Sequence, residues 1–284
     1  MTKIISGKDL AIKVKSSVKQ EIEELIKQGY RAPKLSVILV GEDPASQSYV
    51  KGKSKACQEV GIINETIVLP ASITEEEVLH KIDELNNNPD VDGILVQLPL
   101  PSHINETTVI ERVDVNKDVD GFNSLNVAYL YQKKDCIYPC TPKGIVKLIE
   151  SANIEISGKN VCVIGRSQIV GLPSAKLLLD KNATVTICHS KTRNLKNITK
   201  KADILVVALG KPKFITKEYV KHSACVIDVG VNRDPSTNKL CGDCDFDSLN
   251  GYVKYLTKVP GGVGPMTISC LMENTLELYK KHIK

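Results

Sequence analysis

Short apolar runs alternate with amphipathic stretches along this chain. The runs are rich in β-branched residues, as buried strands are, and they lie at 35–40, 67–69, 93–96, 161–164, 184–188, 204–208 and 225–229. The stretches between them carry apolar residues at helical spacing, which predicts helices at 10–25, 45–60, 74–86, 141–149, 175–179 and 268–281. Strands that alternate with helices are typical of parallel sheets covered by helices. The pattern therefore predicts an α/β protein.

One of these strand-to-helix junctions has the composition of a nucleotide-binding turn. The strand at 161–164 runs directly into Gly165-Arg166-Ser167, and Gly171 precedes the next helix. A helix that starts behind a glycine turn offers N–H donors and a positive dipole end to a pyrophosphate. The spacing is not G-x-G-x-x-G, so the turn alone also fits an ordinary βα turn of another α/β protein.

The end of the following strand indicates which dinucleotide would bind. NAD-binding folds usually place an acidic residue there, to hold the ribose 2′-hydroxyl. This chain has His189-Ser190-Lys191 instead, and Arg166 lies in the preceding turn. Basic and hydroxyl groups suit a 2′-phosphate, which predicts NADP rather than NAD. His189 and Lys191 also fit a solvated loop.

The length and the loops predict two domains. A chain of 284 residues can form two cores. The polar, turn-rich segment 114–122 has the composition of a hinge, 260–267 that of a loop, and the last helix needs a surface to cover. We expect two three-layer α/β domains around a cleft. The first comprises residues 1–121 plus 265–284, and the second, a Rossmann-type NADP-binding domain, residues 122–264.

Composition and charge narrow the class of protein. The net charge of +5 is not gathered into a basic tail, so we expect no nucleic-acid partner. No apolar run has membrane-spanning length and residues 1–5 are too short for a signal peptide, so we expect a cytoplasmic protein without a membrane contact. The nine cysteines include one close pair, Cys241 and Cys244, without further ligands at zinc spacing. We therefore expect reduced thiols and no metal.

Two segments carry candidate catalytic groups. Tyr49 and Lys53 are four residues apart and share a helix face, whereas Lys51 and Lys55 point elsewhere. Gln97 closes the strand at 93–96, and ligands bind at the carboxyl ends of parallel strands. Taken alone, these residues also fit a surface lysine and a turn-stabilising amide.

Two further loops could contact a ligand. Asp118 and Asp120 flank a tight turn, where either carboxylate could pair with a heterocycle that carries donor nitrogens or could form an Asx turn. The glycines of 260–264 allow a close approach of backbone to a ligand, although they also suit a flexible connector.

Together these pieces resemble one family. The six motifs, in chain order, are Tyr49-x-x-x-Lys53, Gly93-Ile-Leu-Val-Gln97-Leu-Pro, Asp118-Val-Asp-Gly-Phe122, Gly165-Arg-Ser-x-Ile-Val-Gly171-x-Pro, His189-Ser-Lys-Thr192 and Pro260-Gly-Gly-Val-Gly-Pro-Met-Thr267. This order is similar to that in bifunctional methylenetetrahydrofolate dehydrogenase/methenyltetrahydrofolate cyclohydrolase, the FolD type. The resemblance covers the chain from Tyr49 to Thr267.

The resemblance implies a function in one-carbon metabolism, which supplies purine, methionine and histidine biosynthesis. The enzyme would oxidise 5,10-methylenetetrahydrofolate with NADP and hydrolyse the 5,10-methenyl product to 10-formyltetrahydrofolate. Lys53 matches the central catalytic lysine, as a neutral base or a charged orienting group. Tyr49 matches its partner, Gln97 the glutamine that tunes it, and Asp120 the carboxylate that holds the pterin edge.

The resemblance also implies binding residues and an assembly. The substrate would contact Tyr49, Lys53, Val96, Gln97, Leu98, Asp120, Pro260, Gly261, Gly262, Val263 and Gly264. The cofactor would contact Gly165, Arg166, Ser167, Ser190 and Val231. The family implies a homodimer. Two other readings stay open at this point, a dehydrogenase without cyclohydrolase activity and a non-catalytic nucleotide-sensing protein.

Overall fold

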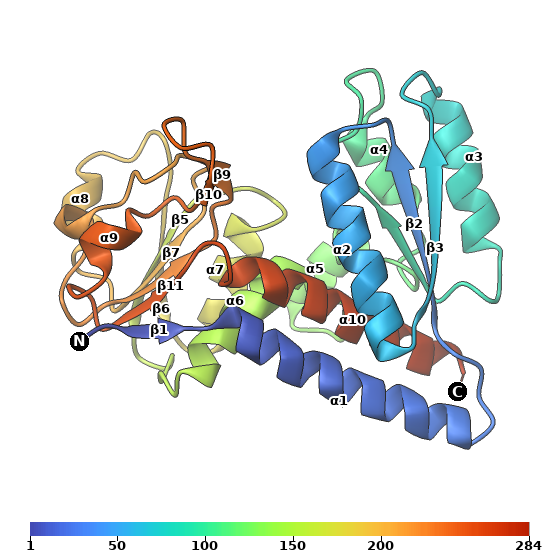
Figure 1. The fold of residues 1–284 in the computed structure, drawn as a ribbon, viewed down its shortest axis with the longest axis horizontal. Coiled ribbons are helices and arrows are strands. Elements are labelled where there is room, and N and C mark those ends of the chain that lie inside the picture. Colours follow the sequence, from blue (N-terminus) through green and yellow to red (C-terminus); the bar gives the residue numbers. More distant parts are fainter. Residues whose placement is uncertain (284) are drawn as a thin grey trace. The chain divides into compact units, whose positions relative to one another are not determined.

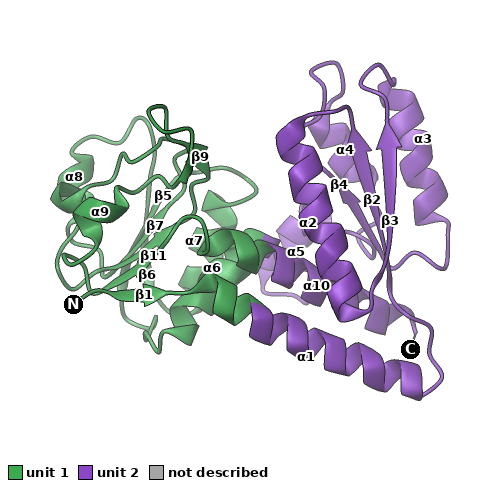
Figure 2. Cartoon of the chain, viewed as in Figure 1, with its two compact units in different colours: residues 1–11, 141–267 green, residues 12–140, 268–284 purple. Residues whose placement is uncertain are grey.

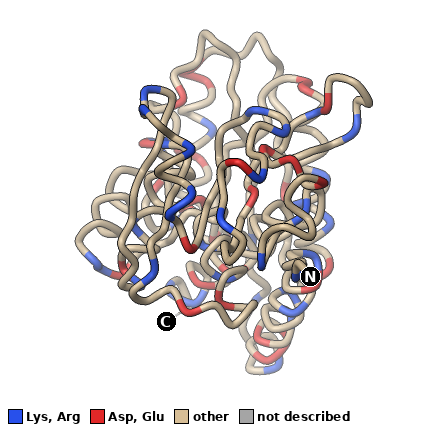
Figure 3. Tube along the Cα trace, turned by 90° about the vertical axis from the view of Figure 1, so that its left-hand side faces the viewer, with Lys and Arg blue, Asp and Glu red and all other residues tan. Residues whose placement is uncertain are grey.

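The chain forms two compact units, each built from two segments that are separated in the sequence. The computed structural model describes residues 1–283. Unit 1 comprises residues 1–11 and 141–267, and unit 2 comprises residues 12–140 and the chain from Ile268 onward (Figure 2). Basic and acidic residues are interspersed along the chain (Figure 3).

Unit 2 contains a parallel sheet of three strands. The strand order is β3–β2–β4, with bounds Ile63–Leu69, Lys34–Val40 and Gly93–Val96. Val40 and Ile38 of β2 pack with Val78 and Ile82 of α3. Helix α2 lies on the opposite side of the sheet (Figure 1). The unit is therefore the three-layer arrangement that the sequence predicts.

The helices of unit 2 begin at recognisable caps. Thr74 caps α3 in a capping box with Glu77, and Asp43 caps α2 through the N–H of Ser46. The helices are α2 (Pro44–Val60), α3 (Glu75–Asn86), α4 (Glu106–Arg112) and α5 (Ser124–Gln132), together with most of α1 (Gly7–Lys27) and α10 (Val263–His282).

Unit 1 contains a parallel sheet of six strands. The order is β1–β11–β8–β7–β5–β6, with bounds Lys3–Ile5, Tyr255–Thr257, Cys225–Asp228, Ile204–Val207, Asn160–Ile164 and Thr184–Cys188. Counted from β5 in chain order, five of these strands lie as 2-1-3-4-5. In this doubly wound order the direction of winding reverses between β5 and β7, and ligands bind at such a switch point.

Helices cover both faces of this sheet. Helix α7 packs on β5 and β6, whereas Ile198 of α8 and Leu249 of α9 pack on the face that carries Ile164. The remaining elements are α6 (Cys140–Ser151), α7 (Gly171–Asp180), α8 (Leu195–Thr199), η1 (Lys217–Tyr219), β9 (Asn232–Arg233), β10 (Leu240–Cys241) and α9 (Phe246–Leu249).

The structure differs from the sequence-based boundaries in three places. Residues 3–5 form a strand on β11 and lie in unit 1. Residues 122–140 lie in unit 2, because Asn126 donates to Asp118 and accepts from the N–H of Ile137. The segment 260–267 is a loop only in its first part, since α10 begins at Val263. Within residues 1–283, no helix is long and apolar enough to cross a membrane.

Candidate functional site

Lys53 and Gln97 meet through a direct hydrogen bond. The Lys53 Nζ donates to the Gln97 Oε1 at 2.9 Å, from the middle of α2 to the residue that follows β4. The Gln97 Nε2 donates to the carbonyl of Leu98 at 2.6 Å, which fixes the orientation of the amide. Tyr49 lies one helical turn before Lys53 and is 44% exposed. The sheet and the helix thus place three of the predicted groups beside one another.

The backbone of β4 determines the position of Gln97. All four residues of β4 are buried, and the Gln97 N–H donates to the carbonyl of Ile38 at 2.9 Å, so pairing with β2 extends to Gln97. A side chain at Gly93 would bring its Cβ within 2.4 Å of Val119, which precedes Asp120. The glycine therefore lets the loop of Asp120 pack closely on β4.

Asp120 is a carboxyl whose charge interacts with that of Lys53. Burial raises its pKa to about 6, Lys53 lowers it and the neighbouring Asp118 raises it. The thiol of Cys140 lies 4.0 Å from its Oδ1. At neutral pH the carboxyl is mostly ionised, so it can accept hydrogen bonds from a ligand.

Asp118 holds the loop in which Asp120 lies. Its buried carboxylate accepts from the N–H groups of Gly121 (3.0 Å) and Asn123 (2.8 Å) and from the Asn126 Nδ2 (2.9 Å). The sequence left open whether Asp118 or Asp120 would meet a ligand. These bonds show that Asp118 shapes the turn, and the ligand contact of Asp120 stays a prediction.

Val96, Leu98 and Asp120 line one small cavity. Its volume is about 20 Å³, the size of a single water, and its other lining residues are Ile94, Ile110, Val113, Asp118 and Phe122. Predicted substrate contacts from β4 and from the aspartate loop therefore share a common surface.

The glycine segment Pro260–Gly264 lies in unit 1. The carbonyl of Gly262 would come within 1.7 Å of a Cβ at Gly7, and the Lys8 N–H donates to the carbonyl of Gly261 at 3.1 Å. The segment therefore packs against the start of α1. Its role in substrate binding stays a prediction.

The predicted dinucleotide turn needs both of its glycines. Gly165 has a φ of +130°, and a Cβ there would lie 2.4 Å from the carbonyl oxygen of Ala208. A Cβ at Gly171 would lie 2.3 Å from the carbonyl oxygen of Gly165. The Ser167 Oγ accepts from the N–H groups of Val170 and Gly171. The glycines therefore allow the turn to pack against Ala208, which follows β7, and allow the start of α7 to pack against the turn.

The other predicted cofactor residues lie at the same edge of the sheet. Arg166 and Ser190 are exposed behind β5 and β6, and Val231 follows β8 with 49% of its surface exposed. Since these strands are parallel, their carboxyl ends form one edge. The end of β6 carries no acidic residue, which fits a phosphate on the adenine ribose.

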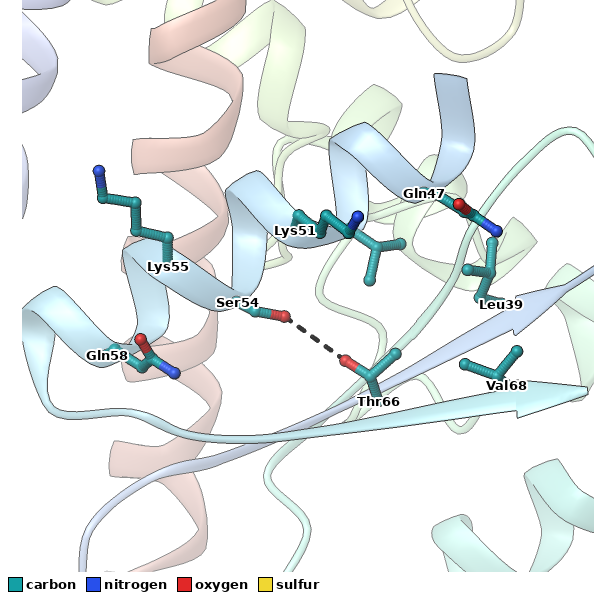
Figure 4. Close-up of a pocket in the computed structure, with 9 residues that line it drawn as sticks. Leu39, Gln47, Lys51, Ser54, Lys55, Gln58, Thr66 and Val68 are labelled. Carbon is teal, nitrogen blue, oxygen red and sulfur yellow. Dashed lines mark hydrogen bonds between the residues drawn. The ribbon is translucent and has the colours of Figure 1, made fainter. Parts of the chain in front are cut away.

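Lys51 and Lys55 line a different surface from Lys53. They border an open groove of about 540 Å³ between α2 and the edge strand β3, together with Leu39, Gln47, Val50, Ser54, Gln58, Thr66 and Val68 (Figure 4). The predicted separation of Lys53 from its neighbouring lysines is confirmed. Among residues 1–283, no three His, Cys, Asp or Glu side chains form a cluster that could hold a metal.

The doubly wound sheet and its glycine turn have the architecture of a dinucleotide-binding α/β protein. Two family models match the chain: the tetrahydrofolate dehydrogenase/cyclohydrolase catalytic domain over residues 5–120, and the NAD(P)-binding domain of the same family over residues 139–283. The chain belongs to the tetrahydrofolate dehydrogenase/cyclohydrolase family.

Individual relatives agree with this assignment. A "Bifunctional protein FolD" from Bacillus anthracis is 55% identical over 278 residues, which are 98% of this chain and 96% of the relative. The FolD structure from Campylobacter jejuni is 44% identical with a TM-score of 0.96 and covers 99% of both chains. A Trypanosoma brucei FolD, solved with NADP cofactor and inhibitor, is 37% identical with a TM-score of 0.95 and covers 100% of this chain and 99% of its own.

The predicted family, α/β fold with a Rossmann-type domain, and bifunctional dehydrogenase/cyclohydrolase activity are confirmed. The reading as a non-catalytic nucleotide sensor is thereby excluded. Sequence reasoning missed three buried polar residues whose side chains accept from or donate to the backbone of neighbouring loops. They are Asp228, Asp243 and Asn274. Their signal was weak, because a buried polar residue is recognised only once its partners are known.

Proposed function

We propose that this chain oxidises 5,10-methylenetetrahydrofolate to the 5,10-methenyl form with NADP and hydrolyses that product to 10-formyltetrahydrofolate at the same site. The observation that carries the assignment is the hydrogen bond from Lys53 to Gln97 near the half-buried Asp120. One cation, one amide and one carboxylate suit a substrate that has donor nitrogens and a reactive carbon.

Each residue of this site has a distinct task. Gln97 accepts from the Lys53 Nζ and so aims the lysine. In the hydrolytic step a water adds to the cationic methenyl carbon, and the bond from that carbon to one ring nitrogen breaks. Lys53 orients the water and relays one of its protons to the released nitrogen, while the other proton leaves to solvent. Asp120 accepts hydrogen bonds from the pterin, and the exposed ring of Tyr49 stacks on the substrate. Val96 and Leu98 contact it through apolar surface.

The turn of unit 1 fits the cofactor. When bound, NADP supplies the acceptor for the hydride of the methylene carbon. Gly165 and Gly171 allow the tight turn that brings the start of α7 to its pyrophosphate, Ser167 shapes the turn, and Arg166 and Ser190 provide charge and a hydroxyl for the 2′-phosphate. Val231 contacts the cofactor through its backbone. We assign substrate contacts to Pro260–Gly264 as well.

We also propose the sequence-based domain roles, with a folate-binding domain and an NADP-binding domain, and a cytoplasmic homodimer. The edge strand β6 supports a dimer through the nucleotide domain, since its Ile187 is exposed. Light scattering should give twice the mass of one chain, and Ile187→Lys should reduce that mass. A wild-type monomer at micromolar concentration would refute the dimer.

Separation of the two products tests the main proposal. Purified protein is supplied with 5,10-methylenetetrahydrofolate and NADP or NAD, and the methenyl and 10-formyl products are measured. We expect turnover with NADP, weaker turnover with NAD, and 10-formyl product faster than the uncatalysed hydrolysis. Accumulation of the methenyl product alone would contradict the assignment of both reactions to this site.

A further inference from the structure

Two buried carboxylates of unit 1 lie outside the proposed catalytic machinery. Asp228 ends β8 and is 3% exposed, and Asp243 is completely buried. The Asp228 carboxylate accepts from the N–H groups of Asp243 (2.9 Å), Cys244 (2.9 Å) and Gly230 (3.1 Å). Asp228 therefore fixes the backbone on which Asp243 stands.

Asp243 in turn binds the loop that follows β7. Its Oδ2 accepts from the N–H groups of Leu209 (2.5 Å) and Gly210 (3.1 Å), and its Oδ1 accepts from the N–H of Lys211 (2.8 Å). The Asn232 Nδ2 donates to the same Oδ1 at 2.8 Å. One side chain thus holds three consecutive N–H groups behind β7 and a side chain behind β8.

Glycines make this close arrangement possible. A Cβ at Gly242 would lie 1.8 Å from the Asp228 Oδ2, and a Cβ at Gly230 would lie 2.2 Å from the Asp243 Cγ. Any larger residue would push a carboxylate away from its donors. The two segments, 228–230 and 242–243, are therefore fitted to each other.

The loops that Asp243 holds border the switch point of the sheet. The turn at Gly165 packs on Ala208, the residue directly before Leu209. Val231 lies between Gly230 and Asn232, both of which contact Asp243. Because Ser190 behind β6 is assigned to the adenine ribose, the loops behind β7 and β8 lie where the other half of a dinucleotide would bind.

We propose that Asp243 is a positioning residue for the dinucleotide: its carboxylate holds the loops 209–211 and 230–232 in the shape that receives the nicotinamide half. The proposal rests on the cofactor site proposed above. Asp243 does not itself touch the cofactor, since its oxygens are occupied by four protein donors.

This role has a signature that a general loss of stability lacks. Hydrolysis of added 5,10-methenyltetrahydrofolate requires no cofactor, whereas oxidation of the methylene form does. Asp243→Asn puts an amide N–H₂ against protein donors and so displaces one of the two loops. We expect the Kd for NADPH to rise about tenfold or more, while cyclohydrolase activity on added methenyl substrate stays within about twofold of wild type.

The experiment combines NADPH fluorescence titration with separate assays of the two reactions. Asp247→Asn, an exposed aspartate of α9, is the matched control and should leave all three values unchanged. Adding Asn232→Asp to Asp243→Asn reverses donor and acceptor at that contact and should recover at least threefold of the lost affinity. If Asp243→Asn does not fold, Asn232→Ala decides, because it removes a single donor and should weaken NADPH binding about threefold.

Three results would overturn the proposal: unchanged NADPH affinity in folded Asp243→Asn, a parallel loss of both activities, or unchanged affinity in Asn232→Ala. Failure of the proposed function would look different. It would leave wild-type protein without NADPH binding or without folate turnover, and NADPH titration tests the role of Asp243 even when folate turnover is absent.

Discussion

Lys53 is one of three lysines within five residues of α2, yet it alone of these three donates to Gln97. The helix separates the side chains, since two positions along it correspond to a rotation of about 200° about its axis, which places them on nearly opposite faces. Position on the helix, and not residue type, therefore distinguishes the proposed catalytic lysine.

Lys53→Met should suppress the hydrolytic step about 100-fold or more, in the range of a lost proton-transfer group. Lys51→Met is the matched control, because it replaces a lysine by methionine on the same helix, and it should retain full activity. Initial rates with added 5,10-methenyltetrahydrofolate measure the difference. Equal effects of the two substitutions would show that helix charge, and not the Gln97 contact, matters.

Asp120 should give substrate binding a pH dependence. Its pKa is raised to about 6, so the carboxyl is ionised at pH 7 and protonated at pH 5. A protonated carboxyl accepts less well from the pterin, so the KM for folate should be flat above pH 7 and rise below about pH 6. Asp120→Asn should raise KM and remove this rise. If the KM still rises below about pH 6 in Asp120→Asn, the titrating group is a different residue.

The same carboxyl should cost stability when it is ionised. Because its folded-state pKa lies above the ordinary 3.8, folded protein binds the proton more tightly than unfolded protein, and stability falls as pH rises from about 4 to 6. At pH 7, Asp120→Asn should therefore be more stable, by at most about 3 kcal/mol. Urea unfolding at pH 7 and pH 4 checks this, and the difference should shrink at pH 4.

At the scale of whole elements, the packing of the dinucleotide turn depends on a glycine. Gly165→Ala would force a Cβ against the backbone of β7, so NADPH affinity should fall at least tenfold. Gly158→Ala is the matched control, because Gly158 also has a positive φ but its Cβ would meet nothing. It should cost only about 1 kcal/mol of stability and leave affinity unchanged. Fluorescence titration and urea unfolding separate the two effects.

Elements with a strong hydrophobic period could be predicted from sequence, and those without one could not. The buried strands β2, β5 and β8 stand out because neighbouring strands cover both edges and helices cover both faces. Strand β1 gives no such signal, since Lys3 and Ile4 are exposed and the strand forms only because β11 offers an edge.

The start of α10 illustrates a second limit. Glycines and prolines at 260–267 indicate a loop, yet Pro265 lies in the first turn of the helix, where its missing N–H has no partner to lose. The candidate site residues were easier to predict than the start of this helix, because Tyr49, Lys53, Gln97 and Asp120 lie in recognisable motifs. The sequence left open whether Asp118 would bind a ligand or support the turn, because its three donors become visible only in the folded loop.

At the scale of the whole molecule, the C-terminal helix completes the unit that holds Lys53. The Asn274 Nδ2 donates to the carbonyls of Val119 and Tyr138, both at 2.9 Å, and the buried Tyr279 donates to the carbonyl of Arg31. A fragment of residues 1–140 loses these donors and the apolar cover of Leu271 and Leu276.

We therefore expect fragment 1–140 to show no cooperative unfolding transition in urea. Full-length Asn274→Ala should unfold cooperatively but be destabilised by about 2 kcal/mol, because the carbonyls of Val119 and Tyr138 lose the amide donor. A sharp transition of the fragment would show that residues 268–283 are dispensable for this core.

Lys53, Gln97 and Asp120 all lie in one compact unit, whereas the glycine turn lies in the other. This distribution has a genetic consequence. An allele that carries Gly165→Ala would still encode the hydrolytic groups, and an allele that carries Lys53→Met would still encode the nucleotide turn. If the methenyl compound diffuses between molecules, two such defective alleles in one cell would complement each other and restore the complete conversion.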